Sequence, residues 1–142
     1  MIPKILVPVD GSATTQKTIE NIITLKDRFS KELTLLHVLN FDHFAYQMIE
    51  DFQMDMVKEN STKAGTLLLE RVGTQLDRAG FVNDLRLEFG EPKQVIADIA
   101  NDELFQLVVI GRHEGGGQIR DVLFGSVANH LLHRVKCPVL LF

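Results

Sequence analysis

The chain has almost no cysteine, since Cys137 is the only one among its 142 residues. An internal disulfide is therefore excluded, and so low a cysteine content is typical of a protein from a reducing compartment. Cys137 directly precedes Pro138 and an apolar segment. We therefore expect it to be a buried structural thiol and not a nucleophile.

The chain also lacks long apolar runs and blocks of one charge. No apolar run approaches the ~20 residues of a membrane-spanning helix, and the N-terminus has no signal-peptide pattern. Lysine and arginine number 15 against 19 aspartates and glutamates, which gives a net charge of −4 without a basic block. This balance argues against nucleic acid as a partner. We expect a cytoplasmic protein that binds neither nucleic acid nor membranes.

What is present is a regular alternation of short apolar segments and amphipathic helical segments. The expected strands are Lys4–Val9, Leu33–Leu39, Leu85–Phe89, Leu107–Ile110 and Pro138–Phe142. The expected helices are Thr14–Phe29, Met48–Ala79, a short one that opens at Pro92, and Val127–Val135. Strands that alternate with helices predict an α/β fold in one domain, residues 1–142, with an open parallel sheet covered by helices on both faces.

Several helix ends have local signals. Ser12 is a natural N-cap for the first helix, Gly80 suits the end of the second, and Pro92 suits the first position of the third. Gly65 and Gly73 weaken the second helix, each by about 1 kcal/mol relative to alanine. A bend or a break in that helix near residues 60–61 is left open.

The segment 111–126, GRHEGGGQIRDVLFGS, follows the fourth strand and carries five of the ten glycines. A strand, a glycine-rich loop and a helix form a place where backbone N–H groups can surround a phosphate. The helix is expected to begin at or near residues 125–126, where the Ser126 hydroxyl can cap it or bind an anion. A flexible surface loop is an equally open interpretation.

A polar side chain, Asp10, ends the first strand. Ligands of parallel α/β sheets bind outside the carboxyl ends of the strands. If the first and fourth strands are neighbours, Asp10 faces the glycine-rich loop across one crevice. The alternative is that Asp10 only caps the first helix together with Ser12. His37, inside the second strand, is expected to be a hydrogen-bonded core or cleft residue.

Familiar nucleotide and catalytic motifs are missing. A Walker A loop needs a GKS or GKT ending, and a dinucleotide-binding fingerprint would follow the first strand, where the sequence is VPVDGS instead. No nucleophile–base arrangement or carboxylate pair can be placed. No catalytic residue is assigned, and any hydrolytic activity is expected to be slow and incidental.

VPVDGS after the first strand and the glycine-rich loop that ends in GS are similar to segments of the universal stress protein family. LLHV, GEP and CPVLLF extend the resemblance over essentially the whole chain. It implies a Rossmann-like five-stranded parallel sheet in the order 3-2-1-4-5, usually in a dimer. The nucleotide-binding branch of the family carries G-x2-G-x9-G-S/T and holds ATP, commonly with a divalent metal such as Mg²⁺.

The resemblance also implies a set of ligand-binding positions. Asp10 corresponds to the aspartate that contacts the nucleoside, residues around it and on the second strand surround the adenine, and the loop glycines with Ser126 hold the phosphates. The metal ligands are left open. The implied contacts for ATP, ADP or AMP are Pro8, Val9, Asp10, Val38, Gly111, Arg112, Gly115, Gly125, Ser126 and Val127.

The chain departs from the family motif in one place. Position 114 is Glu, so three residues separate Gly111 from Gly115 instead of two. The longer loop is either harmless or brings negative charge toward the phosphates, which Arg112 and nearby basic residues would offset. Three functions stay open: an ATP-binding, nucleotide-sensing stress regulator, a family member that has lost the nucleotide and acts as a protein-interaction module, and a slow ATP or ADP hydrolase.

The last strand predicts an assembly. PVLLF carries no charge and no helix follows it, so it would form an exposed apolar sheet edge of the kind that aggregates unless it is covered. Pairing with the same strand of a second copy about a two-fold axis covers both edges. The family resemblance implies the same homodimer.

Overall fold

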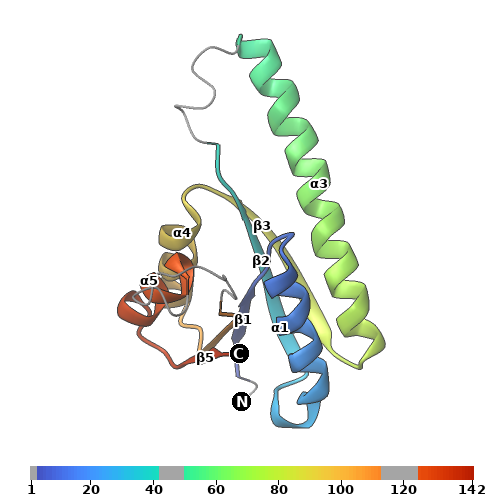
Figure 1. The fold of residues 1–142 in the computed structure, drawn as a ribbon, viewed down its shortest axis with the longest axis vertical. Helices are drawn as coiled ribbons and strands as arrows, with labels where there is room; N and C mark the ends of the chain where they lie inside the picture. Colours follow the sequence, from blue (N-terminus) through green and yellow to red (C-terminus); the bar gives the residue numbers. More distant parts are fainter. Residues whose placement is uncertain (1–2, 42–49, 113–124) are drawn as a thin grey trace, which may run out of the picture.

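The structure is a computed structural model that describes residues 3–41, 50–112 and 125–142. These residues form a five-stranded sheet in which every pairing is parallel, in the order β3-β2-β1-β4-β5 (Figure 1). The strands are β1 (Ile5–Pro8), β2 (Glu32–Leu39), β3 (Val82–Phe89), β4 (Leu107–Ile110) and β5 (Val139–Leu141). Both the α/β class and the strand order agree with the sequence-based prediction.

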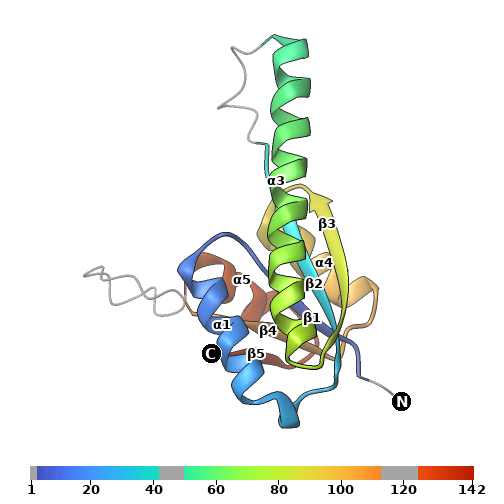
Figure 2. The ribbon, with the colours of Figure 1, turned by 90° about the vertical axis from the view of Figure 1, so that its right-hand side faces the viewer.

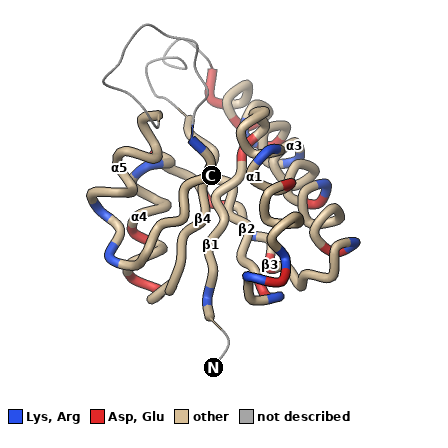
Figure 3. Tube along the Cα trace, turned by 60° about the horizontal axis from the view of Figure 1, so that its bottom comes forward, with Lys and Arg blue, Asp and Glu red and all other residues tan. Residues whose placement is uncertain are grey.

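Helices cover both faces of the sheet. α1 (Ala13–Thr24) and α3 (Asp51–Arg78) pack on one face, and α4 (Pro92–Asp102) and α5 (Ser126–Arg134) on the other (Figures 1 and 2). Each face has its own apolar core. Figure 3 shows that most of the charged residues lie on the helices and the outer segments, whereas β1 and β4 carry none.

The strands at the centre are apolar throughout because both of their faces are buried. In β1, Val7 packs toward α1 and α3 while Leu6 packs toward α4 and α5, and both are fully buried. β3 differs because it is an edge strand and alternates charged and apolar residues. None of the helices within the described ranges is long and apolar enough to cross a membrane.

Two expected boundaries are wrong by several residues. The first helix ends at Thr24 and a short 3-10 turn (Lys26–Arg28) follows, so the segment does not continue as α-helix to Phe29. β3 begins at Val82, three residues before the alternating pattern, because its backbone pairs with the whole length of β2. A backbone ladder needs no particular side chain, so the pattern could not reveal this extension.

α3 is one continuous helix of 28 residues, without a break at residues 60–61. Gly65 and Gly73 allow it to lie close to the sheet. A Cβ atom on Gly65 would be 3.1 Å from His37 Cδ2, and one on Gly73 would be 3.1 Å from Leu85 Cδ2. The first half of α3 extends beyond the sheet, where Phe52 is 64% exposed (Figure 2).

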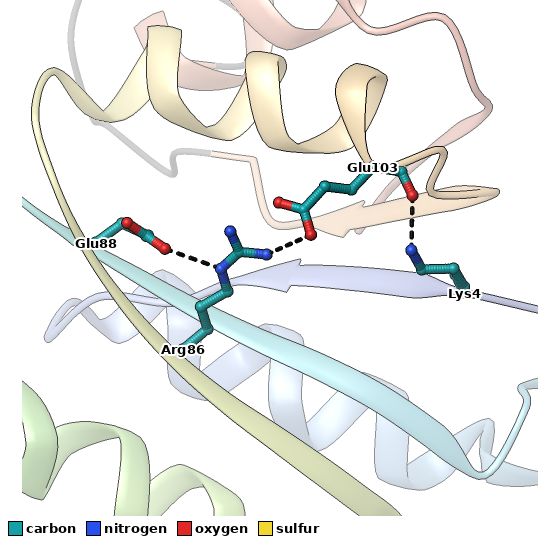
Figure 4. A network of polar contacts seen from close by, with 4 residues as sticks. All are labelled: Lys4, Arg86, Glu88 and Glu103. Atoms are coloured by element: carbon teal, nitrogen blue, oxygen red, sulfur yellow. Dashed lines mark hydrogen bonds and ion pairs between the residues drawn. The ribbon is translucent and has the colours of Figure 1, made fainter.

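A polar network joins the edge strand β3 to the end of α4 (Figure 4). Arg86 donates to Glu88 over 3.0 Å and to Glu103 over 2.7 Å, and Lys4 Nζ donates to the Glu103 carbonyl over 2.6 Å. The hydrogen bond from Arg86 lowers the pKa of Glu103 below its ordinary value. Charges on β3 also protect this open edge against pairing with other strands.

Candidate functional site

A cavity of about 580 Å³ opens at the carboxyl ends of β1, β2 and β4. Its volume falls in the range of small-molecule sites, roughly 300–1,000 Å³. The chain segments that begin α1, α4 and α5 border it. The site therefore lies where the topology predicts it, because β1 and β4 are neighbours and the chain leaves them toward opposite faces of the sheet.

Most of the positions predicted from the sequence line this cavity. Arg112 is not among the lining residues: its backbone N–H donates to the Phe142 carbonyl over 3.0 Å and its side chain is exposed. Gly115, Glu114 and the neighbouring basic residues of the loop lie outside the described residues. The predicted residues at the cavity are Pro8, Val9, Asp10, Val38, Gly111, Gly125, Ser126 and Val127.

The lining of the cavity combines apolar and polar side chains. Val38 on β2, Ile96 on α4 and Ile110 on β4 are among the apolar ones. The polar ones include the Asp10 carboxylate and hydroxyl groups at the starts of α1 and α5. Such a cavity suits a ligand with one flat apolar end and one polar end.

Asp10 lies in the turn between β1 and α1, and one of its oxygens organises that turn. Oδ1 accepts from the Ser12 backbone N–H and from the Thr15 hydroxyl, both over 2.8 Å. Ser12 is the N-cap of α1 and accepts from the Thr15 N–H over 3.3 Å. Asp10 is exposed and lines the cavity, so its carboxylate is accessible to a ligand.

The carboxylate of Asp10 is held in its charged form. Partial burial alone would raise the pKa of this group, but hydrogen bonds from Ser12 and Thr15, together with the nearby His37, lower it below the ordinary value. Asp10 is therefore ionised at neutral pH and acts only as an acceptor there.

His37 on β2 is hydrogen-bonded, as the sequence predicted. Its Nδ1 lies 2.9 Å from the Val9 carbonyl oxygen, and its side chain borders the cavity. Val9 also donates its N–H to the Leu36 carbonyl over 2.8 Å. The segment after β1 is thus attached to β2 through a backbone and a side-chain hydrogen bond.

The three helix N-termini at the cavity are capped differently. The Ser12 side chain caps α1, and the Glu91 side chain caps α4 by accepting from the Gln94 N–H over 3.0 Å. α5 begins at Ser126, and its N-cap residue is Gly125 with φ of 88°, which provides no side-chain cap. Ser126 is thus the first helical residue rather than the cap.

The start of α5 consequently has free donors. The first helical hydrogen bond runs from Asn129 N–H to the Gly125 carbonyl. The backbone N–H groups of residues 126–128 have no hydrogen-bond partner among the described residues. A helix N-terminus with free N–H groups attracts anions through these donors and through the helix dipole.

Gly111 is required by packing at this site. A Cβ atom there would lie 2.6 Å from Thr14 Cγ2 and closer still to Thr18 Oγ1. Sequence reasoning missed both threonines, which line the cavity from α1. Their spacing of four residues on one helix face is the signal that could have found them.

In the described ranges, no group of three or more histidine, cysteine, aspartate or glutamate residues could hold a metal ion. Cys137 is only partly buried, and that burial raises the pKa of its thiol. Cys137 is thus less buried than we expected.

All 142 residues match the sequence model of the universal stress protein family. The chain belongs to this family. Among its relatives is the universal stress protein MJ0577 of Methanocaldococcus jannaschii, which is 28% identical in an alignment that covers 99% of this chain and 94% of the relative. The solved structure of MJ0577 has a TM-score of 0.77 with 27% identity, covering 99% of this chain and 95% of that one.

Two more distant family members share the fold and were solved with nucleotides. A universal stress protein in complex with cAMP has a TM-score of 0.69 at 19% identity, over 99% of this chain and 96% of its own. A universal stress protein from Archaeoglobus fulgidus in complex with dAMP has a TM-score of 0.63 at 22% identity, over 99% and 97%. At these identities the likeness demonstrates the fold.

Proposed function

We propose that the cavity binds an adenine nucleotide, ATP or its shorter relatives ADP and AMP, and that the protein is a nucleotide-sensing regulator of the stress response. The observation that supports this most directly is the N-terminus of α5, whose free N–H groups face the same cavity as the Asp10 carboxylate. Phosphate would bind at residues 126–128, because anions are stabilised at uncapped helix N-termini.

The apolar part of the cavity lining suits the nucleoside. It includes Val38 and Ile96, and such side chains match the faces of a purine ring. Oδ2 of Asp10 can accept a hydrogen bond from a ribose hydroxyl while Oδ1 stays in the turn. The two distant family members with the same fold were solved in complex with the adenine nucleotides cAMP and dAMP, which agrees with this assignment.

A divalent metal such as Mg²⁺ would find one carboxylate, Asp10, in the described lining of the cavity. Mg²⁺ commonly uses one or two carboxylates, substrate phosphates and several waters. Asp10 could therefore hold the metal only together with the phosphates, whose charge the ion would neutralise.

The test is to heat-denature the purified protein, identify any released nucleotide by mass spectrometry, and measure ATP affinity by calorimetry. About one adenine nucleotide per chain, or measurable ATP binding with Mg²⁺, supports the proposal. No nucleotide after denaturation and no binding on addition of ATP with Mg²⁺ would overturn it and favour the protein-interaction module.

A pair of glycine variants separates binding from folding. Gly125 and Gly80 both have positive φ, 88° and 96°, but only Gly125 borders the cavity. Alanine at either position strains the backbone by roughly 1–3 kcal/mol. We expect Gly125→Ala to weaken ATP binding at least tenfold and Gly80→Ala to leave it unchanged.

We also propose that the protein forms a homodimer through β5. The outer edge of this strand is uncharged, whereas the other edge strand, β3, carries Asp84, Arg86 and Glu88. Charged residues prevent pairing at a sheet edge, and their absence from β5 favours it. A two-fold axis would pair β5 with its own copy.

A further inference from the structure

The peptide unit between Val9 and Asp10 is held on both sides. Its C=O group lies 2.9 Å from Nδ1 of His37, and its N–H group donates to the Thr15 hydroxyl over 2.9 Å. A peptide unit is planar, so two hydrogen bonds to its opposite edges fix its orientation. The direction in which the Asp10 side chain leaves the backbone is set by that orientation.

His37 is the hydrogen-bond donor to the Val9 carbonyl oxygen. A carbonyl oxygen can only accept, so Nδ1 of His37 carries the hydrogen of this bond. The same hydrogen bond occurs where β1 and β2 separate, just after Val9 N–H makes its hydrogen bond to the Leu36 carbonyl. The imidazole therefore binds the first carbonyl beyond the β1 ladder.

The ring has a defined place against α3. Cδ2 of His37 lies 3.1 Å from the position that a Cβ atom on Gly65 would take, and Leu87 Cδ1 is equally close to it. The glycine leaves room for the ring, and the packing of α3 on the sheet thereby limits its movement.

We propose that His37 is a positioning residue of the nucleotide site, which fixes the Val9–Asp10 peptide and so directs the Asp10 carboxylate to a ligand hydroxyl. The role in ligand binding rests on the function proposed above. The role in fixing the peptide rests only on the two hydrogen bonds. If fewer molecules hold the arrangement that can bind the ligand, the apparent affinity falls by the same factor as the fraction of those molecules.

Two variants of similar size test the donor. Asn at position 37 can place its Nδ2 where the imidazole has Nδ1, whereas Leu has the same shape without a donor. We expect His37→Leu to weaken ATP binding by about fivefold or more, the equivalent of one net hydrogen bond. We expect His37→Asn to stay within about threefold of the wild-type protein.

Two NMR measurements on the protein without added nucleotide test the geometry separately. Imidazole ¹⁵N shifts should identify the Nδ1–H tautomer of His37. Hydrogen exchange of the Asp10 amide should be faster in His37→Leu than in the wild-type protein and near normal in His37→Asn, because the peptide is released only when the donor is lost.

The outcomes distinguish the two proposals. If the wild-type protein binds no adenine nucleotide, the proposed function fails, and the tautomer and the Asp10 exchange still decide whether His37 positions the peptide. If the wild-type protein binds ATP and His37→Leu binds it equally well, the positioning role is wrong while the proposed function stands. An Nε2–H tautomer or unchanged Asp10 exchange in His37→Leu would also overturn the role.

Discussion

Asp10 and Thr15 form a closed pair of hydrogen bonds across the turn between β1 and α1. The backbone N–H of Asp10 donates to the Thr15 hydroxyl over 2.9 Å, and that hydroxyl donates to Oδ1 of Asp10 over 2.8 Å. The two interpretations of Asp10, a capping residue and a ligand-binding residue, are therefore compatible. The carboxylate stabilises the turn through Oδ1, and it also lines the cavity in which we propose that the ligand binds.

The Thr15 hydroxyl should contribute measurably to stability. Thr15 is buried, with 9% of its surface exposed, and Thr15→Val would remove both hydrogen bonds while keeping the shape. We expect a loss of about 1–2 kcal/mol in the free energy of unfolding, measured by urea denaturation. Thr15→Ser keeps the hydroxyl and should lose less. Equal stability of the Val variant and the wild-type protein would contradict the prediction.

The pH dependence of stability should reveal the charge on Asp10. Burial raises the pKa of Asp10, but hydrogen bonds from Ser12 and Thr15 and the field of His37 outweigh it, so the folded-state pKa lies below its ordinary value. Stability from a depressed carboxylate pKa is present above the unfolded pKa and is lost as pH falls through the folded pKa.

The comparison is between the wild-type protein and Asp10→Asn, with denaturation measured from neutral pH to about pH 3. The difference in unfolding free energy should be constant at neutral pH and should shrink below about pH 4, where the unfolded carboxyl takes up a proton. A difference that grows on acidification would mean that the pKa of Asp10 is raised in the folded protein.

Gly111 should tolerate no side chain. Gly111→Ala would place Cβ 2.6 Å from Thr14 Cγ2, so we expect it to destabilise the protein by about 1–3 kcal/mol. Gly11→Ala is the matched control, because no atom lies within 4 Å of its added Cβ; its effect should stay within about 0.5 kcal/mol. Thermal denaturation of both variants checks the prediction, and comparable melting temperatures would refute it.

The dimer proposal predicts a specific effect of proline in β5. Phe142 N–H donates to the Ile110 carbonyl, so alternate residues of this segment face β4 and the N–H of Leu141 faces the open edge. Leu141→Pro would remove an outward donor without breaking the β4 ladder. We expect the wild-type protein to be dimeric and Leu141→Pro monomeric by light scattering, with unchanged circular dichroism. A dimeric variant would exclude pairing through this edge.

Much of the fold was predictable because burial leaves a pattern. The central strands are apolar on both faces, and Ser12, Gly80 and Pro92 mark the helix ends where they were expected. The extension of β3 to Val82 was missed because backbone pairing needs no side-chain pattern. The sequence left a bend or break in α3 open, because the close approach that requires Gly65 exists only after the helix packs on the sheet.

The site was predictable in part for the same reason. Parallel strands end at one edge, so Asp10 and Gly111 meet once β1 and β4 are neighbours. Arg112 was expected to contact the ligand. It does not line the cavity, and its backbone N–H instead donates to the Phe142 carbonyl, just after β5. Thr14 and Thr18 were missed because their importance depends on how closely α1 approaches Gly111.

By itself, the sequence determined the order of elements, the two-sided burial of the sheet and the edge where a ligand would bind, because hydrophobic periodicity and turn residues are local properties. Only the tertiary structure decided which hydrogen bonds the polar groups at that edge form. His37 reaches the Val9 carbonyl across 28 residues of sequence, and such a hydrogen bond depends on the packing of β1, β2 and α3 together.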